Sequence, residues 1–326
     1  MRVVRFLVPL DEIARRSAEA WERGATEVCL QGGIHPSFTG DFYLDVVRVV
    51  KDAAPDMHVH AFTPLEVWQG AATLGIDVES YLTRLRDAGL SSLPGTSAEI
   101  LDDEVRRLIC PDKNTTEQWV DVMLTAHRVG LRATTTIMFG HVERPRHWAR
   151  HLVVLREAQK QGGGFTEFVP LPFVHMEAPI ARRGLARHGP TLEEAVLVHA
   201  VGRLGLHPWI ENVQASWVKL GPDGARIVLR AGANDLGGTL MNESISRAAG
   251  AGHGQEHPPE RMESLIRSIG RRPRQRTTLY GSAAEERRHT ARNPRPLAPP
   301  VNPPAREWHL PARRDLIRPG LVAAEG

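Results

Sequence analysis

The sequence predicts an α/β protein built as a parallel (β/α) barrel, and two observations lead to this prediction. Between Thr26 and Leu236, seven apolar runs rich in β-branched residues each end in a cluster of Gly, Pro, His or acidic residues. Successive strand ends at Gln31, Phe62 and Pro94 are 31 and 32 residues apart, close to the length of a βαβ unit of roughly 30 residues. Repeated units of one handedness close a TIM-type barrel, whose chemistry gathers at the carboxyl ends of the strands.

Helical and strand-like periods alternate along the chain. Residues 11–23 place Ile13 and Trp21 on one face with helical spacing. Residues 133–137 contain three consecutive Thr, which favour a strand. The predicted helices are 11–23, 41–51, 66–74, 78–88, 102–108, 116–129, 146–161 and 192–204, and the predicted strands are 26–30, 57–61, 90–93, 133–137, 164–169, 210–213 and 230–236.

The composition indicates a globular enzyme-sized chain without a membrane span. Of its 326 residues, 41% are hydrophobic and 24% are charged, which allows one large domain. No run of about 18 apolar residues occurs, and the opening segment reaches Asp11 and Glu12 too soon for a secretory signal. We therefore expect a cytoplasmic protein.

The charge is unevenly distributed. Residues 271–326 hold 12 Arg, no Lys and 5 acidic residues, a charge of +7, which leaves −4 for residues 1–270. We divide the chain into an atypical start at 1–10, a partial barrel at 11–280 and a Pro/Arg-rich disordered tail at 281–326. Nucleic-acid binding is not expected, although a basic tail could contact an acidic partner through charge alone.

Only two cysteines are present, Cys29 and Cys110. They are too few and too far apart for a disulfide framework or a CxxC-type metal site, so no metal ligand is predicted from them. Cys29 falls inside a predicted strand, where we expect a buried small apolar residue.

Motifs at the strand ends make the sequence more specific. It resembles the deazaflavin branch of the radical S-adenosylmethionine (SAM) enzymes, and within it the tyrosine-using, CofH-type half of FO synthase. The resemblance covers roughly residues 12–280. The matching segments are 24–34, 57–62, 94–105, 140–142, 163–175, 217–221, 232–241 and 274–278.

The resemblance implies a radical SAM barrel that uses SAM and a 4Fe-4S cluster. In such enzymes a 5'-deoxyadenosyl radical activates L-tyrosine, the Cα–Cβ bond breaks, and the 4-hydroxybenzyl fragment joins 5-amino-6-(D-ribitylamino)uracil. It also implies a possible CofG-type partner half. The barrel would position substrates and exclude water, while the cofactors carry the radical step.

One departure from the family concerns the cluster. The family binds it through a Cys-x3-Cys-x2-Cys loop after the first strand, and the printed sequence contains no such triplet. The first strand and the cluster loop are thus missing or replaced. Three explanations stay open at this stage: a true start further upstream, a change of reading frame, or a cluster-free derivative, with this chain alone expected to be inactive.

Four residues are candidates for holding SAM. Gly32 and Gly33 lack a Cβ and let the backbone approach a ligand, and the resemblance places the amino acid end of SAM there. Thr96 and Glu99 follow the third strand, where Glu99 would face the SAM ribose or amine. The alternatives are a tight turn at the glycines and a helix-start carboxylate at Glu99.

Four further residues are candidates for substrate binding. Glu66 could accept a hydrogen bond from a substrate amine, or could be a solvated helix cap. Asn234 and Asp235, with Gln214 as a weaker case, suit the donors and acceptors of a uracil ring or ribityl hydroxyls. An Asx-type turn is the alternative for Asn234 and Asp235.

Three residues are candidates for catalysis: His141, Glu167 and His175. Glu167 lies between apolar neighbours, where an ionised carboxylate is costly unless it has a partner; a salt bridge to Arg132 or Arg146 is the alternative. His141 could move a proton near neutral pH, or could be a loop histidine bonded to backbone, and His175 offers the same choice.

Three functional classes remain open from sequence alone: an active radical transferase, a non-catalytic barrel that binds the same substrates, and a relative from menaquinone biosynthesis. With the first strand missing or improvised, the strand that contains Val28 and the one that ends at Leu236 are expected to leave a poorly paired edge.

Overall fold

A parallel sheet organises the molecule. The computed structural model describes residues 8–35, 37–243 and 245–299, and in it five strands lie side by side in the order in which they occur in the chain. Two isolated parallel bridges, Phe168 to Val213 and Gln214 to Asp235, continue the same order beyond the last strand. The strands are β1 (Glu27–Cys29), β2 (His58–His60), β3 (Ser92–Leu93), β4 (Arg132–Phe139) and β5 (Phe165–Pro172).

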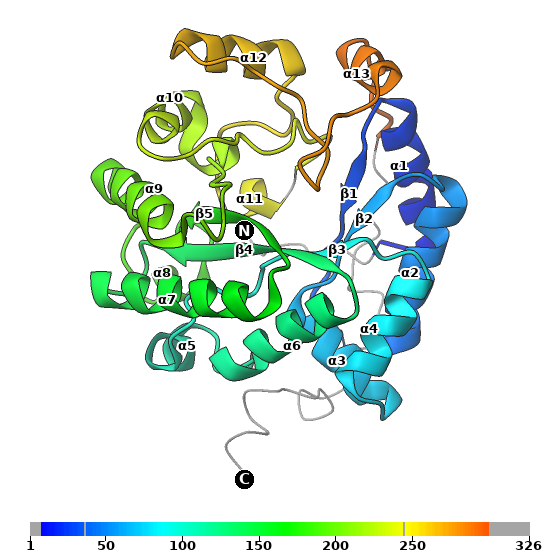
Figure 1. The fold of residues 1–326 in the computed structure, drawn as a ribbon, viewed down its shortest axis with the longest axis horizontal. Helices are drawn as coiled ribbons and strands as arrows, with labels where there is room; N and C mark the ends of the chain where they lie inside the picture. The colour runs from blue at the N-terminus through cyan, green and yellow to red at the C-terminus, as the bar shows by residue number, and fades with distance from the viewer. Residues whose placement is uncertain (1–7, 36, 244, 300–326) are drawn as a thin grey trace.

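Helices cover the outside of this sheet, which confirms the predicted partial (β/α) barrel (Figure 1). All eight predicted helices are present, with ends shifted by only a few residues. The helices are α1 (Leu10–Glu22), α2 (Gly40–Ala53), α3 (Pro64–Leu74), α4 (Val78–Asp87), α5 (Asp103–Ile109), α6 (Thr116–Arg128), α7 (Pro145–Gly162), α8 (Pro179–Arg182), α9 (Leu192–Leu206), α10 (Trp217–Arg230), α11 (Ile245–Ala248), α12 (Pro259–Ser268) and α13 (Glu285–Arg292).

Local sequence explains where several helices begin. Thr63 and Glu66 form a reciprocal capping box at α3, and Thr115 caps α6 in the same way with Gln118. Asp77 accepts a hydrogen bond from the backbone N–H of Ser80 at the start of α4. These caps satisfy N–H groups that have no partner within their own helix.

The hydrophobic core lies between the strands and the surrounding helices. Outward-facing strand residues pack against the inner faces of the helices, as Phe168 on β5 does against Gly202 on α9. The largest fully buried side chains of this core are Trp119, Tyr43, Tyr81, Phe139 and Phe168.

The part of the predicted tail from 281 to 299 is ordered, which moves the predicted boundary. It contains α13, and the guanidinium of Arg287 lies 4.2 Å from the ring centroid of Trp21 on α1. The same side chain donates a hydrogen bond of 2.6 Å to the Trp21 carbonyl. The predicted features at residues 1–7 and 300–326 lie outside the described residues.

Within the described residues, β1 pairs with β2 alone, as the expected edge at Val28 requires. Thr278, from the segment after α12, donates a hydrogen bond to the Glu27 carboxylate of this strand. A late segment of the chain therefore contacts a side chain of β1.

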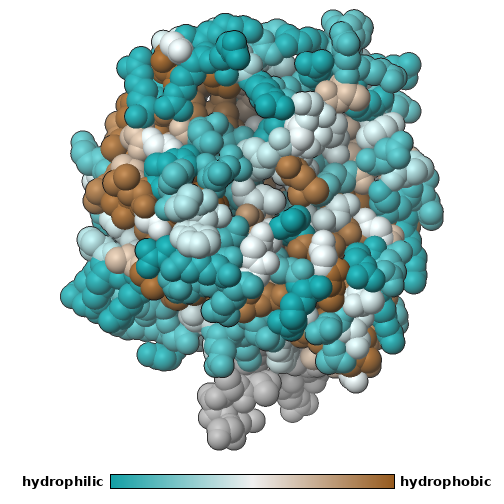
Figure 2. Space-filling model, in the orientation of Figure 1, coloured by the Kyte–Doolittle hydropathy of each residue, from teal (hydrophilic) through white to brown (hydrophobic). Residues whose placement is uncertain are grey.

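No helix among the described residues is long and apolar enough to cross a membrane. Figure 2 shows a largely hydrophilic surface with hydrophobic side chains gathered at the left, over α9. Exposed Leu197, Val201 and Leu204 belong to that helix.

Candidate functional site

The predicted site residues fall into two groups. One group lies at the carboxyl ends of the strands and contains Gly32, Glu66, Glu99 and His141. The other group faces the barrel interior from the strands themselves. It contains Glu167 and the partners described below.

Glu66 ties two strand ends together. Its Oε1 accepts hydrogen bonds from the N–H groups of Gly32 at 2.8 Å and Gly33 at 2.9 Å, and its Oε2 accepts one from Thr63 N–H at 2.8 Å. The side chain is fully buried. Burial raises the pKa of Glu66, while these backbone donors oppose that shift.

This geometry corrects the prediction for Glu66. The residue does cap α3, but the cap is buried rather than solvated, and its carboxylate oxygens are engaged by backbone donors instead of pointing at a substrate amine. The N–H groups of Gly32 and Gly33 are used in the same contacts. Gly33 has a φ of 70° with nothing within 4 Å of a Cβ built there, so space for a ligand remains above the backbone.

His141 is a buried, backbone-bonded histidine. Its Nε2 lies 2.9 Å from the Met138 carbonyl, and its Nδ1 accepts a hydrogen bond from Val142 N–H. These contacts fit the neutral imidazole with its proton on Nε2. Burial lowers the pKa of His141 despite the Glu143 carboxylate nearby. These contacts match the alternative of a loop histidine bonded to backbone.

Glu99 lies close to His141 at the same end of the barrel. Its Oε1 is 2.7 Å from Lys113 Nζ. Burial alone would raise the pKa of Glu99, but the Lys113 ammonium outweighs it and lowers the pKa below its usual range. Thr96 lies half-buried in the same loop. His175 follows β5 and stacks on His188, with ring centroids 4.7 Å apart.

Five side chains from four segments meet in the barrel interior. Glu167 on β5 receives hydrogen bonds from Gln214 Nε2 at 3.2 Å, Arg276 Nη2 at 3.2 Å and the Tyr280 hydroxyl at 2.6 Å. Arg276 also binds both oxygens of Asp235, at 2.5 and 2.8 Å, and its guanidinium lies 4.3 Å from the Tyr280 ring centroid. We call this group the interior network.

The interior network shifts the proton affinity of its members. Burial, reinforced by the Asp235 charge, raises the pKa of Glu167 to about 7, although Arg276, Tyr280 and Gln214 oppose the shift. Burial raises the pKa of Tyr280, and the neighbouring carboxylates act in the same direction. The carboxylate therefore titrates near neutral pH while the phenol stays protonated. The basic partner of Glu167 is Arg276, whereas the salt-bridge alternative named Arg132 or Arg146.

The structure separates Asn234 from Asp235. The Asn234 side chain is exposed, and its Oδ1 accepts hydrogen bonds from Val213 N–H at 2.8 Å and from Arg203 on α9. Adjacent residues of a strand-like segment point to opposite sides, so only Asp235 reaches the interior. Asp235 Oδ1 also accepts the Gly237 N–H at 2.7 Å, which is the expected Asx-type contact.

Three further polar groups of the interior are missing from the sequence prediction. Ser92 Oγ lies 2.7 Å from both His58 Nε2 and His60 Nδ1. The sequence could have indicated the two histidines, because side-chain alternation along β2 places positions 58 and 60 on one face of the strand. Arg276 lies in the matching segment 274–278 but was not predicted as a site residue, and Tyr280 follows that segment, beyond the last strand.

Cys29 is exposed, which corrects the prediction of a buried strand residue. It lies two positions after Glu27 and therefore shares its side of β1. Desolvation by the surrounding protein raises the pKa of the thiol to about 12, and the negative charge of Glu27 acts in the same direction. The thiolate form is therefore disfavoured although the residue is exposed.

Lys219 lies in the first turn of α10, at the carboxyl end of the strands. Its Nζ is 3.3 Å from Ser246 Oγ, and burial lowers its pKa. The lysine is part of a matching family segment, residues 217–221, yet was not predicted as a site residue.

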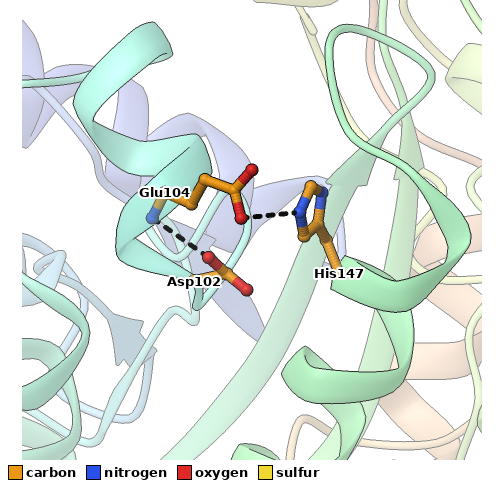
Figure 3. A group of neighbouring side chains, drawn as sticks. All are labelled: Asp102, Glu104 and His147. Atoms are coloured by element: carbon orange, nitrogen blue, oxygen red, sulfur yellow. Dashed lines mark hydrogen bonds and ion pairs between the residues drawn. The ribbon is translucent and has the colours of Figure 1, made fainter.

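Asp102, Glu104 and His147 gather on the outside of the barrel (Figure 3), with potential ligand atoms within 4.8 Å of one another. Two cations already occupy this group: Arg150 lies 3.0 Å from Asp102, and Arg146 lies 2.8 Å from Glu104. Their guanidinium groups balance both carboxylates, so the cluster has the features of a surface ion-pair network.

Comparison with known proteins assigns the class. Residues 2–154 match the model of the radical SAM superfamily, and residues 162–288 match the CofH/MqnC C-terminal region. The fold is similar to that of methylornithine synthase (PylB), with a TM-score of 0.56 and 19% identity over 82% of this chain and 74% of that one. The fold and these matches define a radical SAM barrel protein.

Sequence relatives make the assignment specific. A 5-amino-6-(D-ribitylamino)uracil--L-tyrosine 4-hydroxyphenyl transferase from Methanopyrus kandleri is 53% identical over 270 residues, 83% of this chain and 73% of the relative. One from Methanothermobacter thermautotrophicus is 50% identical over 84% of this chain and 75% of the relative. The chain belongs to this family, the CofH type of FO synthase.

Longer relatives contain the same region as one part of a larger protein. FO synthase from Streptomyces coelicolor is 51% identical over 288 residues, which are 88% of this chain but 33% of the relative. The chain therefore spans about one third of the length of such FO synthases.

Proposed function

We propose that the chain is the tyrosine-using module of FO synthesis, which transfers a 4-hydroxybenzyl group from L-tyrosine to 5-amino-6-(D-ribitylamino)uracil. The observation that carries the proposal is the interior network around Glu167, in a chain about half identical to relatives named for that activity. A CofG-type half, as part of a longer chain or as a separate subunit, is the proposed partner.

The residues fit SAM better than they fit the cluster. Gly33 leaves open space beside its backbone, and Glu99 has a carboxylate at the strand ends, so these two residues would hold SAM. An iron–sulfur cluster requires clustered thiolates. Cys29 ends β1 and Cys110 follows α5; the pKa of both thiols is raised, and Cys110 is buried. Two separate protonated thiols do not form a three-thiolate set.

The described side chains support substrate binding and proton control. Glu167 can accept a proton at neutral pH because its pKa is about 7. Gln214 presents a carboxamide beside it, a group that both donates and accepts hydrogen bonds. A heterocycle rich in N–H and C=O groups, such as an aminouracil, matches that pair.

Binding measurements test this proposal directly. Isothermal titration of the full chain with 5-amino-6-(D-ribitylamino)uracil, and separately with L-tyrosine, should give saturable binding. Gln214→Ala should weaken aminouracil binding about tenfold, the cost of one well-placed hydrogen bond. Asn234→Ala, a matched amide on the outer side of the same region, should leave affinity unchanged.

The same experiment separates the alternatives. A non-catalytic barrel would bind both ligands yet form no product even in a longer chain that supplies the Cys-x3-Cys-x2-Cys loop, with the partner half, SAM and a reductant present. A menaquinone-pathway relative would bind an enolpyruvyl substrate in preference to the aminouracil. Absence of aminouracil binding in the intact chain would remove the proposed function.

A further inference from the structure

The segment from Arg276 to Tyr280 lies after the last barrel strand, yet its side chains enter the barrel interior. Arg276 contacts Asp235 and Glu167, Thr278 contacts Glu27 on β1, and Tyr280 contacts Glu167 on β5. It thus touches β1, at one side of the sheet, and the strand-like segment at Asp235, at the other. No family comparison above assigns a role to this segment.

The contacts are directional and involve charged groups. Arg276 holds Asp235 through two parallel N–H···O bonds and reaches Glu167 with the same guanidinium. Such forked contacts fix orientation as well as charge. The Tyr280 ring lies beside that guanidinium, and its hydroxyl donates a hydrogen bond to Glu167 Oε2. The other side chain that contacts the Glu167 carboxylate among the described residues is Gln214, whose Nε2 lies 3.2 Å from both oxygens.

We propose that Arg276 and Tyr280 are positioning residues that hold the Glu167 carboxylate in the orientation and protonation state required for ligand binding. The inference rests on the proposed function for the identity of the ligand. The new element is that the site depends on the segment from Arg276 to Tyr280, which lies outside the barrel strands.

The charged and hydrogen-bonding groups that face Glu167 determine the direction in which its pKa shifts. Asp235 opposes its ionisation, whereas Arg276, Tyr280 and Gln214 favour it. Across the interior, burial lowers the pKa of His60; the Glu27 charge opposes this shift and the Arg276 charge reinforces it. Loss of the Tyr280 hydroxyl removes a hydrogen bond to the ionised form, so the pKa of Glu167 rises.

Tyr280→Phe tests the proposal, with Tyr81→Phe as the matched control. Tyr81 donates a buried hydrogen bond to the Gly40 carbonyl, far from the interior network in sequence and on α4. Aminouracil affinity, measured by isothermal titration between pH 5.5 and 9, should fall about tenfold in Tyr280→Phe, with its pH midpoint raised by about one unit. Tyr81→Phe should keep both the affinity and the midpoint.

Arg276→Lys keeps the charge but loses the fork, and should reduce affinity in the same way. Its control is Arg274→Lys, an exposed neighbour in the same segment. Wild-type affinity and an unchanged midpoint in both Tyr280→Phe and Arg276→Lys would overturn the proposal and leave the segment as a structural closure only.

A second measurement keeps the two proposals distinguishable. Carbon-13 NMR of side-chain carboxylates, with the Glu167 signal assigned by its loss in Glu167→Gln, reports the titration without any ligand. An upward shift of that titration in Tyr280→Phe alone supports the positioning role even if the wild-type chain binds no aminouracil. An unchanged titration contradicts it even if the wild-type chain binds well.

Discussion

The Tyr280 hydroxyl donates a hydrogen bond of 2.6 Å to Glu167 Oε2, across 113 residues of sequence. This contact joins the segment after α12 to strand β5. It also places a phenol beside a carboxylate that titrates near neutral pH, so the interior of the barrel changes charge within the physiological range.

The stability of the protein should depend on pH through Glu167. Its folded pKa of about 7 lies above the unfolded value near 4.3, so the folded state binds more protons between these values. Its contribution is complete below the unfolded pKa and is lost as the pH rises through about 7. Urea unfolding of the wild type and Glu167→Gln from pH 4 to 8 should show this difference; parallel stability curves would contradict it.

Buried histidines should give the opposite pH dependence of stability. Burial lowers the pKa of His151 to about 3, below an unfolded value near 6.5. Its stabilising contribution is therefore present above pH 6.5 and is lost as the pH falls toward 3. His151→Asn keeps an acceptor for the Leu101 N–H. The free energy of unfolding should fall less steeply with acid in this variant than in the wild type; equal slopes would count against the prediction.

Glu66 should be critical for stability. Glu66→Gln places an amide donor among the backbone donors of Gly32, Gly33 and Thr63. We expect a loss of about 2–4 kcal/mol in the free energy of unfolding, because at least one buried group loses its partner. Glu79→Gln, on the exposed surface of α4, is the control and should change stability by less than about 0.5 kcal/mol. Equal effects in both variants would refute the role assigned to Glu66.

Gly95 should tolerate no side chain. A Cβ there would lie 2.7 Å from Thr135 Cα and 2.7 Å from Thr136 N, both backbone atoms of β4. Gly95→Ala should therefore cost about 2 kcal/mol or more in thermal or urea unfolding, since the strand must move. Gly252→Ala introduces a methyl group into open space and serves as the control. A Gly95→Ala variant as stable as this control would show that β4 yields easily.

The sequence allowed the strand order and most helices to be predicted because their apolar periods are regular. α10 was not predicted, since Gly221 and Pro222 interrupt its pattern with a kink. α13 was placed in a disordered tail for a different reason. None of its residues is buried, and Arg287 attaches it to Trp21. The helix therefore has no apolar periodicity that the sequence could reveal.

The site was only partly predictable. Glu167, Gln214 and Asp235 meet as expected for strand residues that share one barrel interior. Asn234 was grouped with Asp235 although strand alternation places neighbours on opposite sides. Whether Glu66 faces a ligand or the backbone depends on the path of the Gly32–Gly33 loop, which a local pattern does not specify. These residue roles in binding and catalysis stay predictions.

The contact between Thr278 and Glu27 spans 251 residues of sequence. Contacts at such separation form late, because a long loop must close before they contribute. During synthesis, β1 leaves the ribosome long before its counterpart exists. β1 thus waits without this contact until residue 278 has emerged, and chaperone demand should peak in that interval.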